Sequence, residues 1–176
     1  MPPMNENDAS EQRVAVVGAS GFVGARLVES LAATQKVVAI ARSARKNAEN
    51  VEWRAADLYS LQSTRAALAG CAVAYYLVHS MMPSSKLMQG RFHDTDLLLA
   101  DNFARACVHA GVKRIVYLGG LLPEQGFVSE HLESRREVEL VLTSSGIPTT
   151  CLRAGLVVGK GGSSFEMLRQ LVERLP

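Results

Sequence analysis

The chain has few cysteines, little net charge and no long apolar run. Its three cysteines, Cys71, Cys107 and Cys151, lie far apart in apolar segments, which favours reduced, buried thiols over disulfides or a metal site. The formal net charge is only +2 and the Lys and Arg residues are scattered, so nucleic acid is not expected as the main partner. Apolar runs are interrupted by Arg, His or Gly before they reach the roughly 20 residues that a spanning helix needs. The few cysteines and the absence of a long apolar run predict a cytoplasmic protein without a membrane span or a metal site.

The length and apolar content of the chain are those of a one-domain globular protein. It has 176 residues, of which 48% are hydrophobic and 20% charged, enough for one domain with a substantial core. The first twelve residues are polar and lack the charged-then-apolar order of a signal peptide. We therefore expect a disordered tail over residues 1–12 and one domain over residues 13–176.

Apolar runs alternate with helical patterns along the chain. Six nearly continuous apolar runs are typical of strands that are buried on both faces; they span residues 14–17, 36–42, 51–58, 71–79, 113–120 and 148–159. Helical spacing follows at residues 22–31, 60–70, 91–110, 130–146 and 163–176. The alternation predicts an α/β fold: a doubly wound parallel sheet of about six strands in a three-layer α/β/α arrangement, the Rossmann architecture.

The helical spacing also predicts the buried faces of two long helices. For residues 91–110 the expected face holds Leu97, Leu98, Phe103, Ala104 and Cys107. For residues 130–146 it holds Val138, Leu140, Val141 and Leu142.

Three glycines follow the first strand, in the segment VAVVGASGFVG over residues 14–24. At this strand-to-helix junction Gly18 permits a tight turn, Gly21 lets backbone amides approach a pyrophosphate, and Gly24 lets the helix lie close to the strand. The helix N-terminus then faces the anion. The motif predicts dinucleotide binding, although a turn between strand and helix can use glycines for backbone reasons alone. The expected contacts are Gly18, Ser20, Gly21, Phe22, Val23 and Gly24.

Further cofactor contacts are expected where the other strands end. In doubly wound sheets the ligand lies outside the carboxyl ends of the strands, near the point where the strand order reverses. This rule selects Arg42, Asp57, Leu58, Val78, His79, Ser80, Leu118 and Gly119.

Arg42 stands where a chain that prefers NAD usually carries an acidic residue for the ribose 2′-hydroxyl. A cation at this position suits a 2′-phosphate, Arg45 and Lys46 follow closely, and arginine binds phosphate through two parallel hydrogen bonds. The segment favours NADP(H) over NAD(H). The alternative is a solvated basic loop.

Asp57 and His79 each have two interpretations. Asp57 could accept a hydrogen bond from an adenine amino group, or it could cap a helix that starts at Leu58 or Ser60. His79 lies beside Ser80, where ribose or substrate is expected, and its near-neutral pKa suits proton transfer. A histidine at a strand end can equally be a hydrogen-bonded structural residue.

Several segments together resemble the atypical extended short-chain dehydrogenase/reductases of the NmrA-like NAD(P)-binding type. They are GASGFVG at 18–24, AADL at 55–58, AYYLVHSM at 74–81, RIVYLGGL at 114–121, HLESRREV at 131–138 and LRAGLVVG at 152–159. The resemblance covers residues 14–176. Its YLVHSM and YLGGL segments are similar to one bacterial branch of NAD(P)-binding proteins.

The resemblance implies a changed catalytic set. Active short-chain dehydrogenases carry Tyr, and Lys four residues later, where this chain has His131 and Arg135. Their hydroxyl residue at the end of the fifth strand is matched by Gly119 and Gly120. His131 could act as a general acid while Arg135 holds cofactor hydroxyls or phosphate, since residues i and i+4 share a helix face. The alternative is that both belong to a solvated, charged helix start.

The resemblance leaves two functions open. Extended members carry a carboxy-terminal substrate lobe, which we expect this chain to lack, and the apolar surface left exposed would favour a homodimer. One expected function is an NADP-dependent oxidoreductase or isomerase for a small substrate, with His131 or His79 as the proton donor. The other is a non-catalytic dinucleotide-binding module that serves as a sensor or an assembly partner.

Overall fold

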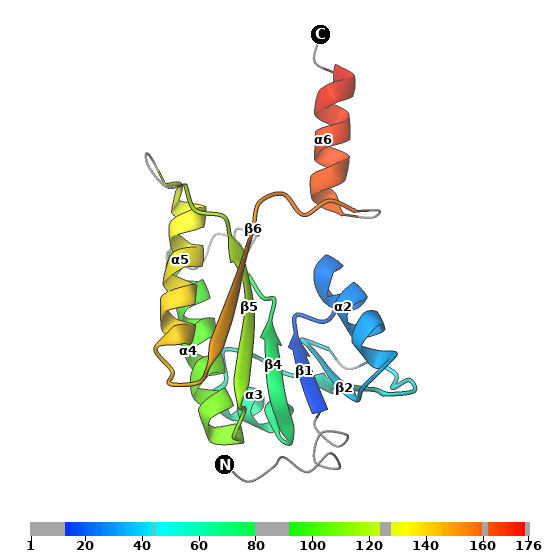
Figure 1. The fold of residues 1–176 in the computed structure, drawn as a ribbon, viewed down its shortest axis with the longest axis vertical. Helices are drawn as coiled ribbons and strands as arrows, with labels where there is room; N and C mark the ends of the chain where they lie inside the picture. Colours follow the sequence, from blue (N-terminus) through cyan, green and yellow to red (C-terminus); the bar gives the residue numbers. More distant parts are fainter. Residues whose placement is uncertain (1–12, 44, 80–91, 124–127, 160–161, 175–176) are drawn as a thin grey trace, which may run out of the picture.

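The computed structural model describes residues 13–43, 45–79, 92–123, 128–159 and 162–174 (Figure 1). The predicted disordered tail at 1–12 lies outside these residues. The elements are β1 Arg13–Val17, α2 Phe22–Ala32, β2 Val37–Ala41, β3 Val51–Ala55, α3 Leu61–Leu68, β4 Cys71–Tyr76, α4 Phe92–Ala110, β5 Arg114–Gly120, α5 Glu130–Thr143, β6 Thr149–Ala154 and α6 Ser163–Arg174.

The six strands form one parallel sheet in the order β3-β2-β1-β4-β5-β6. The chain first runs outward from β1 to β3, then crosses back to β4 on the other side of β1. This arrangement confirms the predicted doubly wound Rossmann fold. The reversal lies between β1 and β4, so the crevice at their carboxyl ends is the expected ligand position.

Helices lie on both faces of the sheet, but unevenly. α4 packs between α3 and α5 on one face, and α2 packs on β1 and β2 on the other (Figure 1). The larger core lies under α4 and contains the fully buried rings of Tyr76, Phe103 and Tyr117. The ring centroids of Tyr76 and Phe103 are 4.6 Å apart. α6 stands clear of the sheet beyond its carboxyl edge (Figure 1).

Three strands end at least three residues earlier than the sequence predicts. The third was expected to reach Leu58 and ends at Ala55, because its neighbour β2 ends at Ala41, opposite Ala55. Likewise β4 ends at Tyr76, opposite the last residue of β1, and β6 ends at Ala154, opposite Gly120. Ladder pairing therefore stops where the shorter neighbour turns away, a limit that an apolar run does not reveal. The residues beyond each strand become loops at the ligand edge.

Two predicted core residues point outward. Leu98 of α4 is 47% exposed and Leu140 of α5 is 58% exposed, so both predictions were wrong. Leu99 and Ala100 occupy the buried face of α4 instead. The error arises because three consecutive leucines at 97–99 cannot all face one side of a helix with 3.6 residues per turn. Cys71 and Cys107 are buried free thiols, as predicted, and Cys151 is a half-buried free thiol. In the described part of the chain, no helix combines the length and apolarity required to cross a bilayer.

Candidate functional site: a dinucleotide-binding edge

Gly18 is required by both conformation and space. Its φ is +90°, and a Cβ atom there would lie 3.0 Å from the carbonyl oxygen of Leu77 and 3.2 Å from Cγ2 of Val78. The amides of Gly18 and Ala19 both donate to the carbonyl oxygen of Ile40, each at 3.1 Å. The turn is thus fixed between the loop after β4 and the end of β2, at the crevice.

Gly24 and Gly21 have different surroundings. A Cβ atom on Gly24 would lie 2.2 Å from the carbonyl oxygen of Gly18, so α2 rests directly on the turn. A Cβ atom on Gly21 would meet only that same oxygen, at 3.3 Å, and Gly21 is exposed. Gly21 is the N-cap of α2, has no side chain to cap the helix, and no acidic residue follows in the first turn. The first amides of α2 therefore form a cradle that suits a phosphate.

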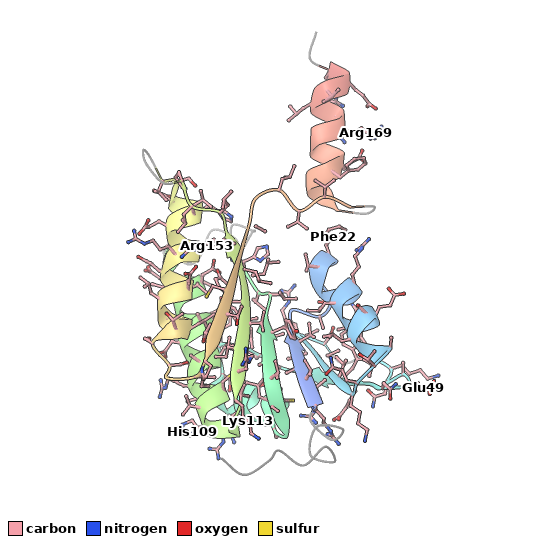
Figure 2. The ribbon with its side chains drawn as sticks, in the orientation of Figure 1. Phe22, Glu49, His109, Lys113, Arg153 and Arg169 are labelled. Atoms are coloured by element: carbon pink, nitrogen blue, oxygen red, sulfur yellow. The ribbon has the colours of Figure 1, made fainter. Side chains whose placement is uncertain are left out.

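The ring of Phe22 packs against the loop that follows β6. A Cβ atom on Gly159 would lie 3.0 Å from Cζ of Phe22, and one on Gly162 would lie 2.8 Å from it. The guanidinium of Arg26 lies over the same ring, 4.2 Å from its centroid. Figure 2 shows Phe22 at the top of α2, below the base of α6. The phosphate turn and the start of α6 are therefore in direct contact.

The loops after β2 and β3 place polar groups at the same edge. Arg42 and Arg45 are exposed, and the guanidinium of Arg45 lies 4.8 Å from the ring centroid of Trp53. The exposed Asp57 accepts a hydrogen bond from the amide of Tyr59 at 3.0 Å. Asp57 therefore closes a local turn. It does not cap a helix, because α3 begins at Leu61 with Ser60 as its cap, and the capping alternative was wrong.

A buried amide holds the loop that contains Leu58. Nδ2 of Asn102, on α4, donates to the carbonyl oxygens of Leu58 at 2.9 Å and Tyr59 at 3.0 Å. Asn102 is 7% exposed. Its two N–H groups pair with two backbone carbonyl oxygens, and leaving these oxygens unpaired beside the core would destabilise the fold. The loop after β3 is thereby fixed relative to α4.

His79 and His131 interact electrostatically at the crevice. His79 follows β4 and His131 lies in the first turn of α5, and both side chains reach solvent. The protein atoms packed around His79 lower its pKa below the usual 6.5, and the charges of Arg135 and His131 lower it further. Partial desolvation lowers the pKa of His131 too, followed by the charge of Arg135. Both imidazoles are therefore neutral at pH 7.

Arg135 is buried, contrary to the solvated helix start that the sequence left open. It is 4% exposed, and its Nη2 donates to Oδ2 of Asp96 at 3.3 Å. Asp96, on α4, is 4% exposed and also accepts from the hydroxyl of Ser134 at 3.3 Å. The hydroxyl of Tyr117 donates to the backbone carbonyl of Arg135 at 3.3 Å. Arg135 is thus a structural cation beneath the two histidines.

A side chain at either glycine at the end of β5 would lie close to a neighbouring side chain. A Cβ atom on Gly119 would lie 2.9 Å from Cε1 of the buried Tyr117. One on Gly120 would lie 2.7 Å from Cδ2 of Leu132. A hydroxyl residue at Gly119 would therefore require the buried ring of Tyr117 to shift, whereas one at Gly120 would displace only the end of the Leu132 side chain.

The structure brings most of the predicted residues to one edge. The glycine turn, Arg42, Asp57, Leu58, Val78, His79, Leu118, Gly119 and His131 all lie in or after the carboxyl halves of their strands or at the start of a following helix. Ser80 lies outside the described residues. The described residues contain no group of three or more His, Cys, Asp or Glu side chains that could hold a metal.

Sequence reasoning missed the partners of Arg135. Asp96 shares the buried face of α4 with Leu99, Ala100 and Phe103, at spacings of three, four and seven residues. A lone carboxylate on an apolar stripe signals a buried ion pair, and this signal was present in the sequence. Its partner on α5 could not be identified without the fold.

A surface hollow at the opposite edge of the sheet does not belong to this site. It has a volume of about 400 Å³ and lies at the amino ends of β1, β2 and β3, lined by Arg13, Lys36, Asn50 and Glu52 among others. Arg13 and Glu52 pair with each other at 3.1 Å. The strand ends that bind ligands in this architecture are at the other side.

Known proteins are similar to this chain in sequence or in structure. Auxiliary protein GraX of Staphylococcus aureus is 28% identical over 111 residues, which are 61% of this chain and 36% of GraX. The quinone oxidoreductase QOR2 of Escherichia coli, solved with NADPH, is 27% identical with a TM-score of 0.63, over 81% of this chain and 48% of QOR2. MoeE5, solved with UDP-glucuronic acid and NAD, is 23% identical with a TM-score of 0.73, over 92% of this chain and 60% of MoeE5.

This chain spans between 36% and 60% of the length of these three proteins. A family model described as NAD(P)H-binding matches residues 18–171, from the first glycine of the turn into α6. The chain therefore belongs to the NAD(P)H-binding family.

Proposed function

We propose that the chain binds NADP(H) at the carboxyl edge of the sheet and supports hydride transfer to and from a small substrate. The observation that carries the binding step is the glycine turn. At Gly18 and Gly24 an added Cβ atom would strike the backbone, while Gly21 leaves the helix amides uncovered. These residues fit a pyrophosphate. The nicotinamide, when bound, exchanges a hydride with a substrate carbon.

The preference for NADP(H) is proposed from Arg42. It is exposed immediately after β2, where the ribose 2′ position of a cofactor held by the turn is expected. QOR2 was solved with NADPH and MoeE5 with NAD, so the fold itself accommodates either form. Arg42 supplies the charge that would distinguish them.

The proton step is assigned to His131, with His79 beside it. At pH 7 the neutral imidazole of His131 accepts the hydroxyl proton of an alcohol substrate as the hydride leaves the same carbon. In the reverse direction the imidazolium returns that proton to the carbonyl oxygen. Desolvation, and after it the charge of Arg135, lowers the pKa of both histidines, which favours the neutral imidazole that acts as the base in substrate oxidation.

Calorimetric titration with NADP⁺, NADPH, NAD⁺ and NADH tests the binding step. Gly21→Asp places a carboxylate at the phosphate cradle and is expected to abolish binding, while the exposed position spares the fold. Arg42→Ala is expected to weaken the binding of NADP⁺ about tenfold, because an arginine-phosphate contact is lost. The affinity for NAD⁺ is expected to stay unchanged. Binding of NADP⁺ by Gly21→Asp as tight as that of the parent would refute the pyrophosphate assignment.

Turnover is tested with NADPH and a panel of carbonyl compounds that includes quinones, since QOR2 is described as a quinone oxidoreductase. His131→Ala is expected to abolish any oxidation of NADPH while its binding persists. Activity that survives in both His131→Ala and His79→Ala would remove the histidines from the mechanism.

A second candidate function is a dinucleotide-binding module without turnover. The observations that favour it are the lack of a hydroxyl group at Gly119 and Gly120 and the burial of Arg135, whose guanidinium pairs with Asp96. This candidate predicts binding without NADPH oxidation for every carbonyl tested, together with a partner whose association differs between the loaded and the empty protein.

A further inference from the structure

The face of the sheet that carries α2 is open over β5 and β6 within the described residues. On this face Val116 lies beside Thr150, and Leu118 lies beside Leu152, in the register of the two strands. Leu152 is 53% exposed. Tyr75 of β4 continues the row, opposite Val116. Parallel sheets are ordinarily covered on both sides, so these four apolar residues, Tyr75, Val116, Leu118 and Leu152, define an open face.

α6 exposes an apolar stripe of its own. Phe165 is 44% exposed, Leu171 50% and Val172 71%. The opposite side of the helix is polar, where Arg169 pairs with both Glu166 and Glu173. Figure 2 shows Arg169 on a helix that stands away from the sheet. An amphipathic helix of this kind gains its stability by packing the apolar stripe against another surface.

We propose that two copies of the chain pair through these surfaces, with α6 of each copy lying on the open face of the other. The surfaces are self-complementary, so one two-fold axis covers all four at once. Their sizes agree, because a helix of 12 residues is about 18 Å long and a strand of six residues is about 20 Å long.

The position of α6 favours a second copy over its own sheet. Gly162, at the start of α6, is held against Phe22, and the helix then rises beyond the carboxyl edge, away from β5 and β6 (Figure 1). The apolar stripe of α6 is therefore accessible to a second molecule. The pairing does not require a bound cofactor, although the open face shares Leu118 with the predicted cofactor edge.

Sedimentation velocity of the 176-residue chain over a concentration series tests the pairing. The parent is expected to dimerise, and Leu152→Glu and Val172→Glu are each expected to raise the dimer Kd at least about tenfold by placing a charge in the contact. Val108→Glu is the matched control, because Val108 is a 52% exposed apolar residue on α4, on the other side of the sheet. It is expected to leave the Kd unchanged. Circular dichroism confirms that each variant is folded.

Complementary charges give a second readout. An equimolar mixture of Leu152→Lys and Val172→Glu chains retains one parental contact and joins opposite charges at the other, so it is expected to dimerise more tightly than either variant alone. A parent chain that stays monomeric at every concentration overturns the pairing, including the case in which α6 folds onto its own sheet. A dimer that neither Leu152→Glu nor Val172→Glu weakens overturns it equally.

Discussion

Replacing Gly24 with alanine changes the phosphate-binding turn at its tightest point. The added carbon would lie 2.2 Å from the carbonyl oxygen of Gly18, and both atoms of that contact are backbone or attached directly to it. The helix or the turn must therefore shift, at a cost of roughly 1–3 kcal/mol. We expect Gly24→Ala to lower the free energy of unfolding by this amount in urea titrations.

Gly21→Ala provides the matched control for Gly24→Ala. Its Cβ atom would meet only the carbonyl oxygen of Gly18, at 3.3 Å, so a far smaller loss of stability is expected. Equal losses at the two positions would contradict the close contact between α2 and the turn.

The two histidines make folding sensitive to mild acid. Because their folded pKa values lie below 6.5, the unfolded chain binds their protons at a higher pH than the folded chain does. Their contribution to stability is present above pH 6.5 and is lost as the pH falls through the folded pKa values. We expect urea midpoints to decline from pH 7 downward, before the carboxylates titrate.

Removal of both side chains should flatten that decline. The variant His79→Gln/His131→Gln is expected to have a shallower pH dependence than the parent, while His109→Gln, near the end of α4, controls for the loss of a histidine. NMR titration of the imidazole protons reads the two pKa values directly. Values above 6.5 for both groups would reverse the sign of this prediction.

At the scale of elements, α4 and α5 are joined by charge as well as by apolar packing. Asp96 and Arg135 have side chains that are each 5% exposed, so loss of the carboxylate leaves a buried guanidinium without its partner. Breaking such a pair typically costs about 3–5 kcal/mol. We expect Asp96→Asn to destabilise the protein by an amount in this range, measured by urea unfolding.

An exposed ion pair on the same helix gives the comparison. Asp101 and Arg105 lie 3.4 Å apart with side chains that are 51% and 59% exposed, and Asp101→Asn is expected to cost at most about 0.5 kcal/mol. The double variant Asp96→Leu/Arg135→Met is expected to recover much of the loss, since it removes both buried charges. If Asp96→Asn is no more harmful than Asp101→Asn, the buried pair does not join the helices.

Local patterns in the sequence predicted the elements but not their ends. The apolar runs located all six strands, and the glycine motif located the turn, because both depend on short-range geometry. The ends of β3 and β4 depend instead on where β2 and β1 stop, which is decided between strands. The outward positions of Leu98 and Leu140 likewise depend on how α4 and α5 are rotated against the sheet.

For the candidate site, too, the sequence predicted which residues lie at the edge of the sheet but not how they are packed. The strand-end rule places residues at one edge from topology alone, so Arg42, Asp57 and His79 were found without coordinates. The burial of Arg135 required knowledge that Asp96 faces it from another helix, across 39 positions of sequence. From the sequence, Arg135 was either a cofactor contact or part of a solvated helix start, and only the three-dimensional packing identifies it as internal.

At the scale of the whole molecule, the central strands of the sheet are paired on both sides and the two border strands on one side only. β1 has a strand on each side and the buried residues of both cores above and below it. β3 and β6 are the outermost strands, so each has a row of backbone groups that no strand in the described residues pairs with. The free energy needed to open a backbone hydrogen bond therefore differs across the sheet.

This difference predicts an order in which the amide hydrogens of the strands exchange with solvent. We expect the amide hydrogens of β1 and β4 to exchange with deuterium only when the whole domain opens, whereas the outward amides of β6 exchange while the centre stays closed. On β3 the outward amides of Val51 and Trp53 donate to the carbonyl oxygen of Ala48 and to Oδ1 of Asn47, so we expect β3 to exchange at an intermediate rate. Exchange followed by mass spectrometry or NMR is expected to label β6 first and β1, the strand that leads into the phosphate turn, last. Equal lifetimes for β1 and β6 would contradict this order. The turn that receives the cofactor is thus attached to the part of the molecule that keeps its shape longest.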